Sequence, residues 1–312
     1  MIEGTIQLGE PVEHRGIVVA PLFPRTTPRA AYLTLAEAIP LGFRITEVDA
    51  AGSVPELVAT NPLETSVLLY DGEELLGAKQ NRILNVTVLL APASETRIPV
   101  SCVEEGRWSA RSVDFDAAPH AAPPELRRRK NERLSAEPLA RGAAQSVVWD
   151  AVRERAGRQG VHSPTGAQAD LFGAREGDLA ELRTAFPALA GQSGALFALG
   201  NRLCLDYVSR PDGFARLYGK LLDGYLLDAT ERLDGEPAAG DRLQAFVAAT
   251  RSAERSRRPS AGLGEDVRLR GDGIVGSGLE LDRELLQLCA FSSDGAGDGA
   301  RTRILRPSRR RS

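Results

Sequence analysis

Residues 66–85 read SVLLYDGEELLGAKQNRILN, and this stretch decides how the first part of the chain folds. Two apolar arms flank Asp71-Gly72, a dipeptide typical of the tight turn that joins two antiparallel strands. The sequence therefore predicts a β-hairpin here. Four polar residues follow the second arm: Lys79, Gln80, Asn81 and Arg82. They form either a solvated bend at the end of a strand or the floor of a binding site.

The chain as a whole combines short apolar runs, turn residues and amphipathic helical segments, which predicts an α+β fold. We expect a β-rich N-terminal half that packs with a helical middle and with a C-terminal region of helices and short strands. These three parts correspond to residues 1–115, 125–190 and 194–291 of one compact unit, 1–291. Residues 292–312 are Gly-rich and then Arg-rich, which predicts a disordered tail.

Two local signals sharpen this prediction. Residues 32–42 have the apolar spacing of a short helix, with Thr34 as the N-cap and Gly42 at the end. Further along, the dipeptide Gly200-Asn201 lies between two apolar arms and predicts a second hairpin.

The net charge of the 312 residues is −3, so no global field recruits nucleic acid or a membrane surface. The Arg-rich tail is the segment suited to a polyanion such as nucleic acid. The first residues lack the pattern of a signal peptide and no apolar stretch is long enough to span a bilayer, which predicts a cytoplasmic protein without membrane contact. Cys102, Cys204 and Cys289 are scattered, as are the three histidines, so we expect neither a disulfide nor a metal site.

Lysine is rare in this chain, since only Lys79, Lys130 and Lys220 among the 39 basic residues are lysines. Lysine is a flexible point charge whose pKa can shift, whereas arginine is a rigid fork. A position that keeps lysine in this background is therefore a candidate for a role that needs the amine. Lys130 lies in ELRRRKNERL, a predicted helix over residues 125–134 whose charges we interpret as a solvent-exposed face.

The polar quartet has the chemistry of an anion site. Lys79 and Arg82 can neutralise a phosphate or a carboxylate, and the amides of Gln80 and Asn81 can recognise an amide or hydroxyl edge. Asn85 follows on the same stretch, and with Asn81 it makes two of the chain's five asparagines, a concentration that favours a site over a bend.

A second polar group follows an apolar run in IPVSCVEEGRW, residues 98–108. Glu104, Arg107 and Trp108 suit the lining of a pocket, as an acid, an anion clamp and a stacking surface. Cys102 is a candidate nucleophile only where a base or a cation lowers its pKa. A cysteine on the apolar face of a strand is more often part of the core.

Six segments resemble those of a bacterial domain family of unknown function: GSVPEL, DGEELLGAKQNRILN, IPVSCVEEGRW, QSVVW, LYGKLLDGYLLDA and GLGEDVRLRGDGIVGSGLELD. The resemblance extends to about Phe291. The family is named for its gene-neighbourhood association with ADP-ribosylglycohydrolases and rhodanese-phosphatase proteins. This association implies the processing of NAD-derived or ADP-ribosyl compounds, but it carries no mechanism.

Two functions follow from these patterns. In the first, the protein binds an anionic small molecule, most simply a nucleotide or an ADP-ribose or NAD-derived compound, with Lys79 and Arg82 on the anion and Trp108 on a ring. If it is also an enzyme, the predicted catalytic residues are Glu74 or Glu104 as the general base and Lys79 beside it. In the second, it is a non-catalytic scaffold or adaptor. The chain contains no Walker loop, dinucleotide fingerprint, hydrolase or kinase signature, and so identifies no cofactor.

Overall fold

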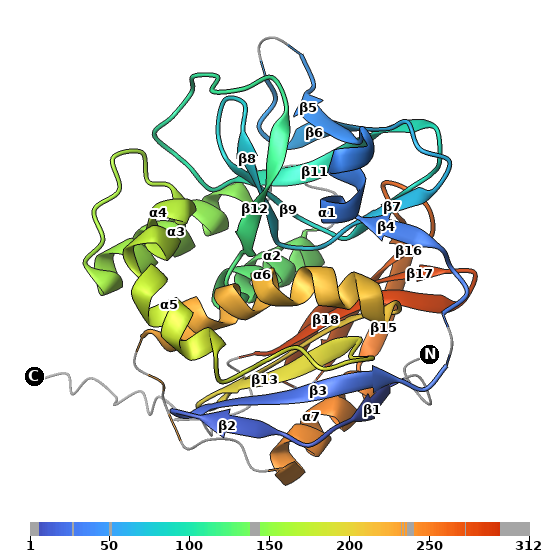
Figure 1. Cartoon of the computed structure of the whole chain (residues 1–312), viewed down its shortest axis with the longest axis vertical. Helices are drawn as coiled ribbons and strands as arrows, with labels where there is room; N and C mark the ends of the chain where they lie inside the picture. Colours follow the sequence, from blue (N-terminus) through green and yellow to red (C-terminus); the bar gives the residue numbers. More distant parts are fainter. Residues whose placement is uncertain are drawn as a thin grey trace, which may run out of the picture.

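The computed structural model of the chain describes residues 6–26, 28–49, 52–137, 144–231, 233, 235, 240–271 and 273–293. In these residues the strands form three sheets that are joined and covered by helices, which confirms the predicted α+β fold (Figure 1). The Arg-rich part of the predicted tail, residues 294–312, lies outside the described residues.

The largest sheet is built from both ends of the chain. Its strands are β1 (Ile6–Leu8), β2 (Val12–His14), β3 (Ile17–Pro24), β13 (Gly194–Leu199), β14 (Arg202–Val208), β15 (Glu254–Pro259), β16 (Glu265–Gly271), β17 (Ile274–Leu281) and β18 (Glu284–Ser292). They are antiparallel in the order β1-β3-β13-β14-β18-β17-β16-β15, with β2 beside β3. Leu199 pairs with Arg202 across the turn between β13 and β14, so the hairpin predicted at Gly200-Asn201 is confirmed.

Two smaller sheets come from the N-terminal half. One contains β4 (Tyr32–Thr34), β7 (Ser66–Leu69) and β10 (Val88–Leu90), in the order β10-β7-β4. The other contains β5 (Arg44–Glu47), β6 (Glu56–Asn61), β8 (Glu73–Gly77), β9 (Arg82–Leu84), β11 (Ser94–Cys102) and β12 (Phe115–Ala121). Its order is β12-β8-β9-β11-β6-β5. The polar quartet therefore belongs to this six-stranded sheet.

The hairpin predicted at Asp71-Gly72 is wrong, although the chain does turn there. The N–H of Glu73 donates to Tyr70 O at 3.0 Å, which closes a four-residue turn, but β7 and β8 belong to different sheets. Of the two central residues Gly72 alone has a positive φ, +84°, whereas the turn that favours paired strands needs a positive φ at both. Asp71 is also fully buried instead of lying at a solvent-exposed hairpin tip. The turn therefore passes the chain from one sheet to the next.

The helices lie on both sides of the largest sheet. They are α1 (Leu35–Ala38) with the 3-10 turn η1 (Ile39–Leu41), α2 (Pro124–Ala136), α3 (Gln145–Gln159), α4 (Gln168–Ala174), α5 (Glu176–Arg183), α6 (Pro211–Ala229) and α7 (Gly240–Ser252). Figure 1 shows α6 crossing between the largest sheet and the smaller sheets, with α7 on the opposite face. None of the described helices is long and apolar enough to cross a bilayer.

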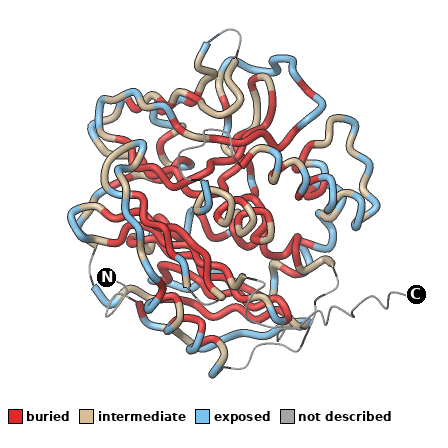
Figure 2. The backbone as a smooth tube through the Cα atoms, turned by 180° about the vertical axis from the view of Figure 1, so that it is seen from behind, coloured by how far each residue is buried: buried red, intermediate tan, exposed pale blue. Residues whose placement is uncertain are grey.

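Helix α6 holds the layers together because both of its faces are buried. Tyr225 stacks on Phe197 of β13 with ring centres 3.6 Å apart, and Gly224 lies against the backbone of Ala121 and Ala122 at the end of β12. In Figure 2 the buried backbone runs through the strands of the largest sheet and through the helix beside them. The short helix predicted over residues 32–42 is confirmed as α1 and η1, begun by a capping box at Thr34.

The interpretation of ELRRRKNERL as a solvent-exposed face is wrong for two of its residues. Arg127 and Lys130 lie on the buried side of α2 and are fully buried. Lys130 donates to Asp71 and to the backbone oxygen of Leu84, the latter at 2.7 Å. Lys220 donates to Glu73 at 3.0 Å. Two of the three lysines thus bind carboxylates of the turn between β7 and β8, where a compact ammonium group fits.

Candidate functional site

The polar quartet forms the connection between β8 and β9. Leu75 pairs with Arg82 across these strands, so residues 78–81 make the turn and Arg82 begins β9. The turn folds inward, since Gln80 and Asn81 are buried, while Lys79 is half-buried at the surface. The quartet is thus a strand connection and a cluster of polar groups at the same time.

Glu104 and Arg107, from the loop after β11, hold this turn in place. Arg107 donates to Glu104 Oε2 at 2.6 Å and to the backbone oxygen of Ala78 at 2.7 Å. The N–H of Asn81 donates to the same carboxylate at 3.1 Å, and Gln80 Nε2 donates to Glu104 O at 2.8 Å. Burial alone would raise the pKa of Glu104, but the hydrogen bonds from Arg107 and Asn81 outweigh it and lower the pKa. Glu104 is therefore an ionised anchor of the turn.

Arg82 is the centre of the cluster and is fully buried. Its Nη1 donates to Gln80 Oε1 at 2.8 Å and to the sulfur of Cys102, and both acceptors belong to side chains without a formal charge. One carboxylate, Glu47 on β5, approaches its Nη2 to 3.9 Å. Within the described residues, Nε and Nη2 of Arg82 have no hydrogen-bond partner. Buried donors are nearly always paired, so Arg82 has unused capacity to bind an anion.

Cys102 lies opposite Arg82 on β11 and is also buried. Its thiol donates to Gln80 Oε1 at 3.1 Å, and the side-chain amide of Gln145 on α3 brackets its backbone at 2.8 and 3.0 Å. Burial raises the pKa of Cys102 to about 11, although Arg82 opposes this shift. At neutral pH the residue is a neutral thiol and not an activated nucleophile.

Lys79 and Trp108 lie above this cluster. Lys79 Nζ and the Arg82 guanidinium carbon lie 5.3 and 5.8 Å from the centre of the Trp108 ring, within the range of cation–π contacts. Trp108 is 50% exposed, whereas Arg82 is fully buried. Lys79 and the exposed ring therefore form a polar and aromatic patch on the surface, and the buried Arg82 lies beneath the same ring.

The structure does not bring Glu74 to this cluster. Leu75, not Glu74, pairs with Arg82, and side chains alternate along a strand, so Glu74 points to the other face of the sheet. On that face its Oε2 accepts a hydrogen bond from Gln168 at 2.6 Å and lies 3.0 Å from His120 Nε2.

Asn85 and Glu47 show what a local pattern can and cannot predict. Asn85 was predicted for the site, but its Oδ1 accepts a hydrogen bond from Ser101 at 2.9 Å and so joins β11 to the end of β9. Glu47 was not predicted, yet it approaches Arg82 and accepts the N–H of Lys79 at 3.4 Å. No sequence signal marks Glu47, because its strand, β5, is not paired with β9. In the order of the sheet, β6 and β11 lie between these two strands.

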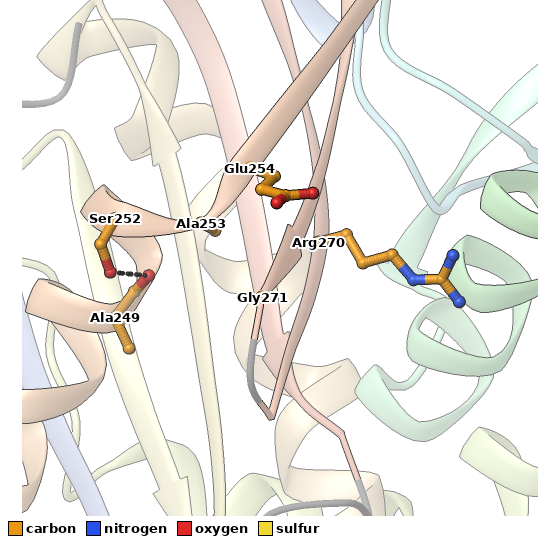
Figure 3. A pocket seen from close by; sticks show the side chains of 6 residues that line it. All are labelled: Ala249, Ser252, Ala253, Glu254, Arg270 and Gly271. Atoms are coloured by element: carbon orange, nitrogen blue, oxygen red, sulfur yellow. Dashed lines mark hydrogen bonds between the residues drawn. The ribbon is translucent and has the colours of Figure 1, made fainter.

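Two of the cavities in the described part of the chain illustrate spaces that lie away from the Arg82 side chain. One, of about 460 Å³, lies where α7 meets β15 and includes Ser252, Glu254 and Arg270 in its lining (Figure 3). Arg270 extends away from the other lining residues, so polar groups do not converge there. The other, of about 690 Å³, lies among α2, α3 and the β13–β14 turn, and its lining includes five arginines. No single sequence motif predicts this cavity, because its lining residues come from separate segments, although Arg128 and Arg129 are adjacent.

A comparison with family models decides what kind of chain this is. The model of ARPP-1, the ARG and Rhodanese-Phosphatase-superfamily-associated Protein domain, matches residues 5–291. The chain belongs to the ARPP-1 family. This confirms the resemblance carried by the six sequence segments. No curated protein and no solved structure matches the chain.

The ARPP-1 match includes the whole polar cluster, but the family name describes no chemistry for it. The chemistry of the site therefore follows from its geometry. Its free donors are guanidinium N–H groups, with an ammonium group and an indole ring at the surface above them. In the described ranges no three His, Cys, Asp or Glu side chains gather as a metal centre would require. The arrangement is suited to an anion that also carries a ring.

Proposed function

We propose that the protein binds an anionic small molecule at the Arg82 cluster, which we define as Lys79, Gln80, Arg82, Arg107 and Trp108. The observation that carries this proposal is the Arg82 guanidinium, which is fully buried and has two nitrogens without a hydrogen-bond partner among the described residues. An incompletely paired charge in the interior is costly, and a bound anion would remove that cost. Trp108 must move for an anion to reach Arg82, and its half-exposed position permits such a movement.

The ligand class that suits this cluster is a nucleotide or an ADP-ribose or NAD-derived compound. Arg82 offers a fork that can bind a phosphate through two N–H groups, and Lys79 adds a second positive charge. Trp108 offers a flat apolar face for a base. The association recorded in the ARPP-1 name supports the same class of compound.

The proposal concerns binding rather than a catalytic step. Glu104 is held by Arg107 and Thr165, at 2.6 and 3.0 Å, and its lowered pKa makes it a weak base. A base role for Glu74 would require a ligand on the other face of the sheet. In this proposal Glu104, Asn81 and Arg107 therefore position the turn that presents Arg82.

A thermal-shift screen tests the proposal. The panel contains NAD, ADP-ribose, nucleotides, sugar phosphates and divalent metals, each at a concentration that would saturate a micromolar site. A ligand present at about 100 times its Kd stabilises the fold by roughly 2.7 kcal/mol. We expect one class of phosphorylated compound to raise the melting temperature. Lys79→Ala and Trp108→Ala should remove this rise. Without ligand, both variants should change the melting temperature no more than a typical surface substitution does.

The matched control is Val113→Ala, in the same loop between β11 and β12 as Trp108 and 76% exposed. This variant should retain the full shift. If no compound stabilises the protein, or if the shift survives both Lys79→Ala and Trp108→Ala, the Arg82 cluster is not a ligand site.

A second function, that of a non-catalytic adaptor, is favoured by the exposure of two large apolar side chains on that loop. Trp108 is 50% and Val113 76% exposed, and tryptophan is enriched among the residues that dominate binding at protein interfaces. An adaptor predicts the opposite pattern: Val113→Asp abolishes capture of a protein partner, and no small molecule shifts the melting temperature.

A further inference from the structure

Glu47 is a carboxylate beside the Arg82 cluster to which the proposed function gives no role. It is the last residue of β5, and its side chain is 11% exposed. Its Oε1 accepts the N–H of Lys79 at 3.4 Å, and its Oε2 is buried without a hydrogen-bond partner among the described residues. Burial raises the pKa of Cys102 and the charge of Glu47 adds to this effect. Glu47 therefore acts on the cluster and has an acceptor to spare.

Arg82 has three unused donors next to this carboxylate. An arginine side chain carries five N–H groups, one on Nε and two on each Nη. Nη1 donates to Gln80 and to Cys102, which accounts for two of the five. The three N–H groups on Nε and Nη2 have no hydrogen-bond partner in the described part of the chain. A phosphate bound by the fork of Nε and Nη2 takes two of these three, so one N–H of Nη2 remains.

The distance between Arg82 and Glu47 suits one bridging oxygen. Arg82 Nη2 and Glu47 Oε1 are 3.9 Å apart, which is too far for a hydrogen bond. An oxygen atom at about 2.8 Å from each of them bridges this distance. Such an atom must accept from Arg82 and donate to Glu47. A hydroxyl group does both, whereas the oxygens of an ionised phosphate or carboxylate only accept.

Glu47 also determines which anions suit the Arg82 cluster. A carboxylate 3.9 Å from Arg82 offsets part of its charge, so a bare anion gains less here than it would at an arginine without such a neighbour. A ligand that brings a hydroxyl group gains a charge-assisted hydrogen bond to the same carboxylate. Recognition then depends on a pattern of donors and acceptors and not on an excess of positive charge.

We propose that the ligand of the Arg82 cluster is a nucleoside phosphate with a free ribose hydroxyl, and that Glu47 binds this hydroxyl. The inference rests on the proposed function, in which Arg82 binds the phosphate and Trp108 contacts the ring. In dinucleotide-binding folds an acidic side chain binds a ribose hydroxyl through the same kind of hydrogen bond. Glu47 is thus a specificity-determining residue, which selects ribose compounds over deoxyribose compounds and over inorganic phosphate.

Isothermal titration of the full-length protein with adenosine 5′-monophosphate (AMP) tests the inference, because AMP is a small compound that has the phosphate, the ribose hydroxyls and the ring. Its 2′,3′-dideoxy analogue has the same phosphate and ring but no ribose hydroxyl. We expect AMP to bind at least about tenfold more tightly than this analogue, since it alone makes the hydrogen bond to a charged carboxylate. The 2′-deoxy and 3′-deoxy analogues then show which hydroxyl Glu47 binds.

Three variants assign the preference for AMP to Glu47. In Glu47→Ala the preference should fall below about twofold, because AMP loses a hydrogen bond that the dideoxy analogue never makes. Glu47→Gln keeps an acceptor without the charge and should retain an intermediate preference. Glu95→Ala removes an exposed carboxylate from β11 of the same sheet and should keep the full preference. Melting curves confirm that each variant is folded before it is titrated.

This inference and the proposed function fail through different results. If AMP and its dideoxy analogue bind equally well, or if the preference persists in Glu47→Ala, Glu47 does not bind the ribose and the anion site alone stands. If AMP does not bind but another compound of the thermal-shift panel does, the ribose class is wrong and the Arg82 cluster takes a different anion. If no compound of that panel stabilises the protein, the proposed function fails and this inference fails with it.

Discussion

Arg82 and Arg127 are both fully buried arginines, but their surroundings differ in charge. Arg127 donates to both oxygens of Asp206 at 2.7 and 2.8 Å, and its Nε lies 3.8 Å from Asp71. Its guanidinium carbon lies 5.5 and 5.2 Å from the rings of Tyr70 and Phe291. Arg82 instead bonds to an amide oxygen and a thiol, and one carboxylate lies 3.9 Å away.

This difference separates a structural charge from a candidate functional one. Arg127 has two carboxylates and a bidentate geometry, so its charge is balanced by the fold itself. Tyr70 and Tyr225 also donate to Asp206, each at 2.6 Å, and complete the network. Arg82 lacks this compensation. Glu47 approaches it only to 3.9 Å, and two of its nitrogens have no hydrogen-bond partner among the described residues.

The largest effect is expected for Arg127→Met. Loss of the guanidinium leaves Asp206 buried without its cationic partner, and breaking a buried pair in this way costs about 3–5 kcal/mol. Urea denaturation at pH 7 should show this loss as a lower midpoint with an unchanged slope. Because Arg127 on α2 bonds to β14 of the largest sheet, we also expect the wild type to unfold in one transition, as the single unit 1–291 predicts.

Asp206→Asn in the Arg127→Met background is the control. The asparagine is uncharged but can still accept a hydrogen bond, so it should recover part of the lost stability. If Arg127→Met costs less than about 1 kcal/mol, Arg127 is no better compensated than Arg82 and the contrast between them is lost.

The network around Arg127 also shows why some of the fold could be predicted and some could not. Thr34 and Gly200-Asn201 act on their immediate neighbours, and the helix start and the hairpin that they predict are both present. Arg127 and Arg128 are adjacent and chemically identical in the sequence, yet Arg127 is fully buried because its partner, Asp206, lies on a distant strand. The partition of β7 and β8 between two sheets has the same cause. Val67 and Leu69 pair with Leu90 and Val88, and no local signal specifies that pairing.

The second prediction concerns Glu104, the carboxylate that bonds to Arg107 and not to Arg82. Its pKa is lowered in the folded state, against about 4.3 in an unfolded chain. Its stabilising effect is therefore fully present above about pH 4.3 and is lost as the pH falls through the folded value. We expect Glu104→Gln to cost roughly 1.5–3 kcal/mol at pH 7, the range for hydrogen bonds to a charged group.

Urea midpoints at pH 7, 5 and 3 measure this effect. The difference between the wild type and Glu104→Gln should be constant from pH 7 to 5 and should shrink toward pH 3, where the glutamate of the unfolded chain takes up a proton. A difference that grows toward pH 3 would contradict the lowered pKa. The same variant tests whether ligand binding at the Arg82 cluster depends on Glu104. If it does, Glu104→Gln should also lose the ligand.

The candidate site was predictable in part, and for a definite reason. Lys79, Gln80, Asn81 and Arg82 are consecutive, and IPVSCVEEGRW follows soon after, so the turn between β8 and β9 inevitably lies near that loop. The cavity of about 690 Å³ had no such signal, because its lining residues come from segments as far apart in the chain as α2 and the β13–β14 turn.

A smaller effect is expected for Gly72→Ala, which tests how closely Arg127 packs. Gly72 has a φ of +84°, and an added Cβ would lie 2.7 Å from Arg127 Cδ. Gly160 has a φ of +63° with nothing within 4 Å of an added Cβ, so Gly160→Ala measures the backbone strain alone. We expect Gly160→Ala to cost about 1 kcal/mol and Gly72→Ala about 1–3 kcal/mol. Equal losses in urea denaturation would mean that Arg127 moves aside freely.

The smallest effect on the ligand-free protein is expected for Arg82→Met. Loss of its hydrogen bonds to Gln80 and Cys102 should lower the unfolding free energy by about 1 kcal/mol. Removal of an incompletely paired buried charge offsets part of that loss. We therefore expect the unfolding free energy to fall by less than about 1 kcal/mol, a fraction of the loss in Arg127→Met. Added anion should stabilise the wild type but not Arg82→Met. If Arg82→Met is as unstable as Arg127→Met without any anion, Arg82 is a structural residue, because the fold alone would then already use its charge.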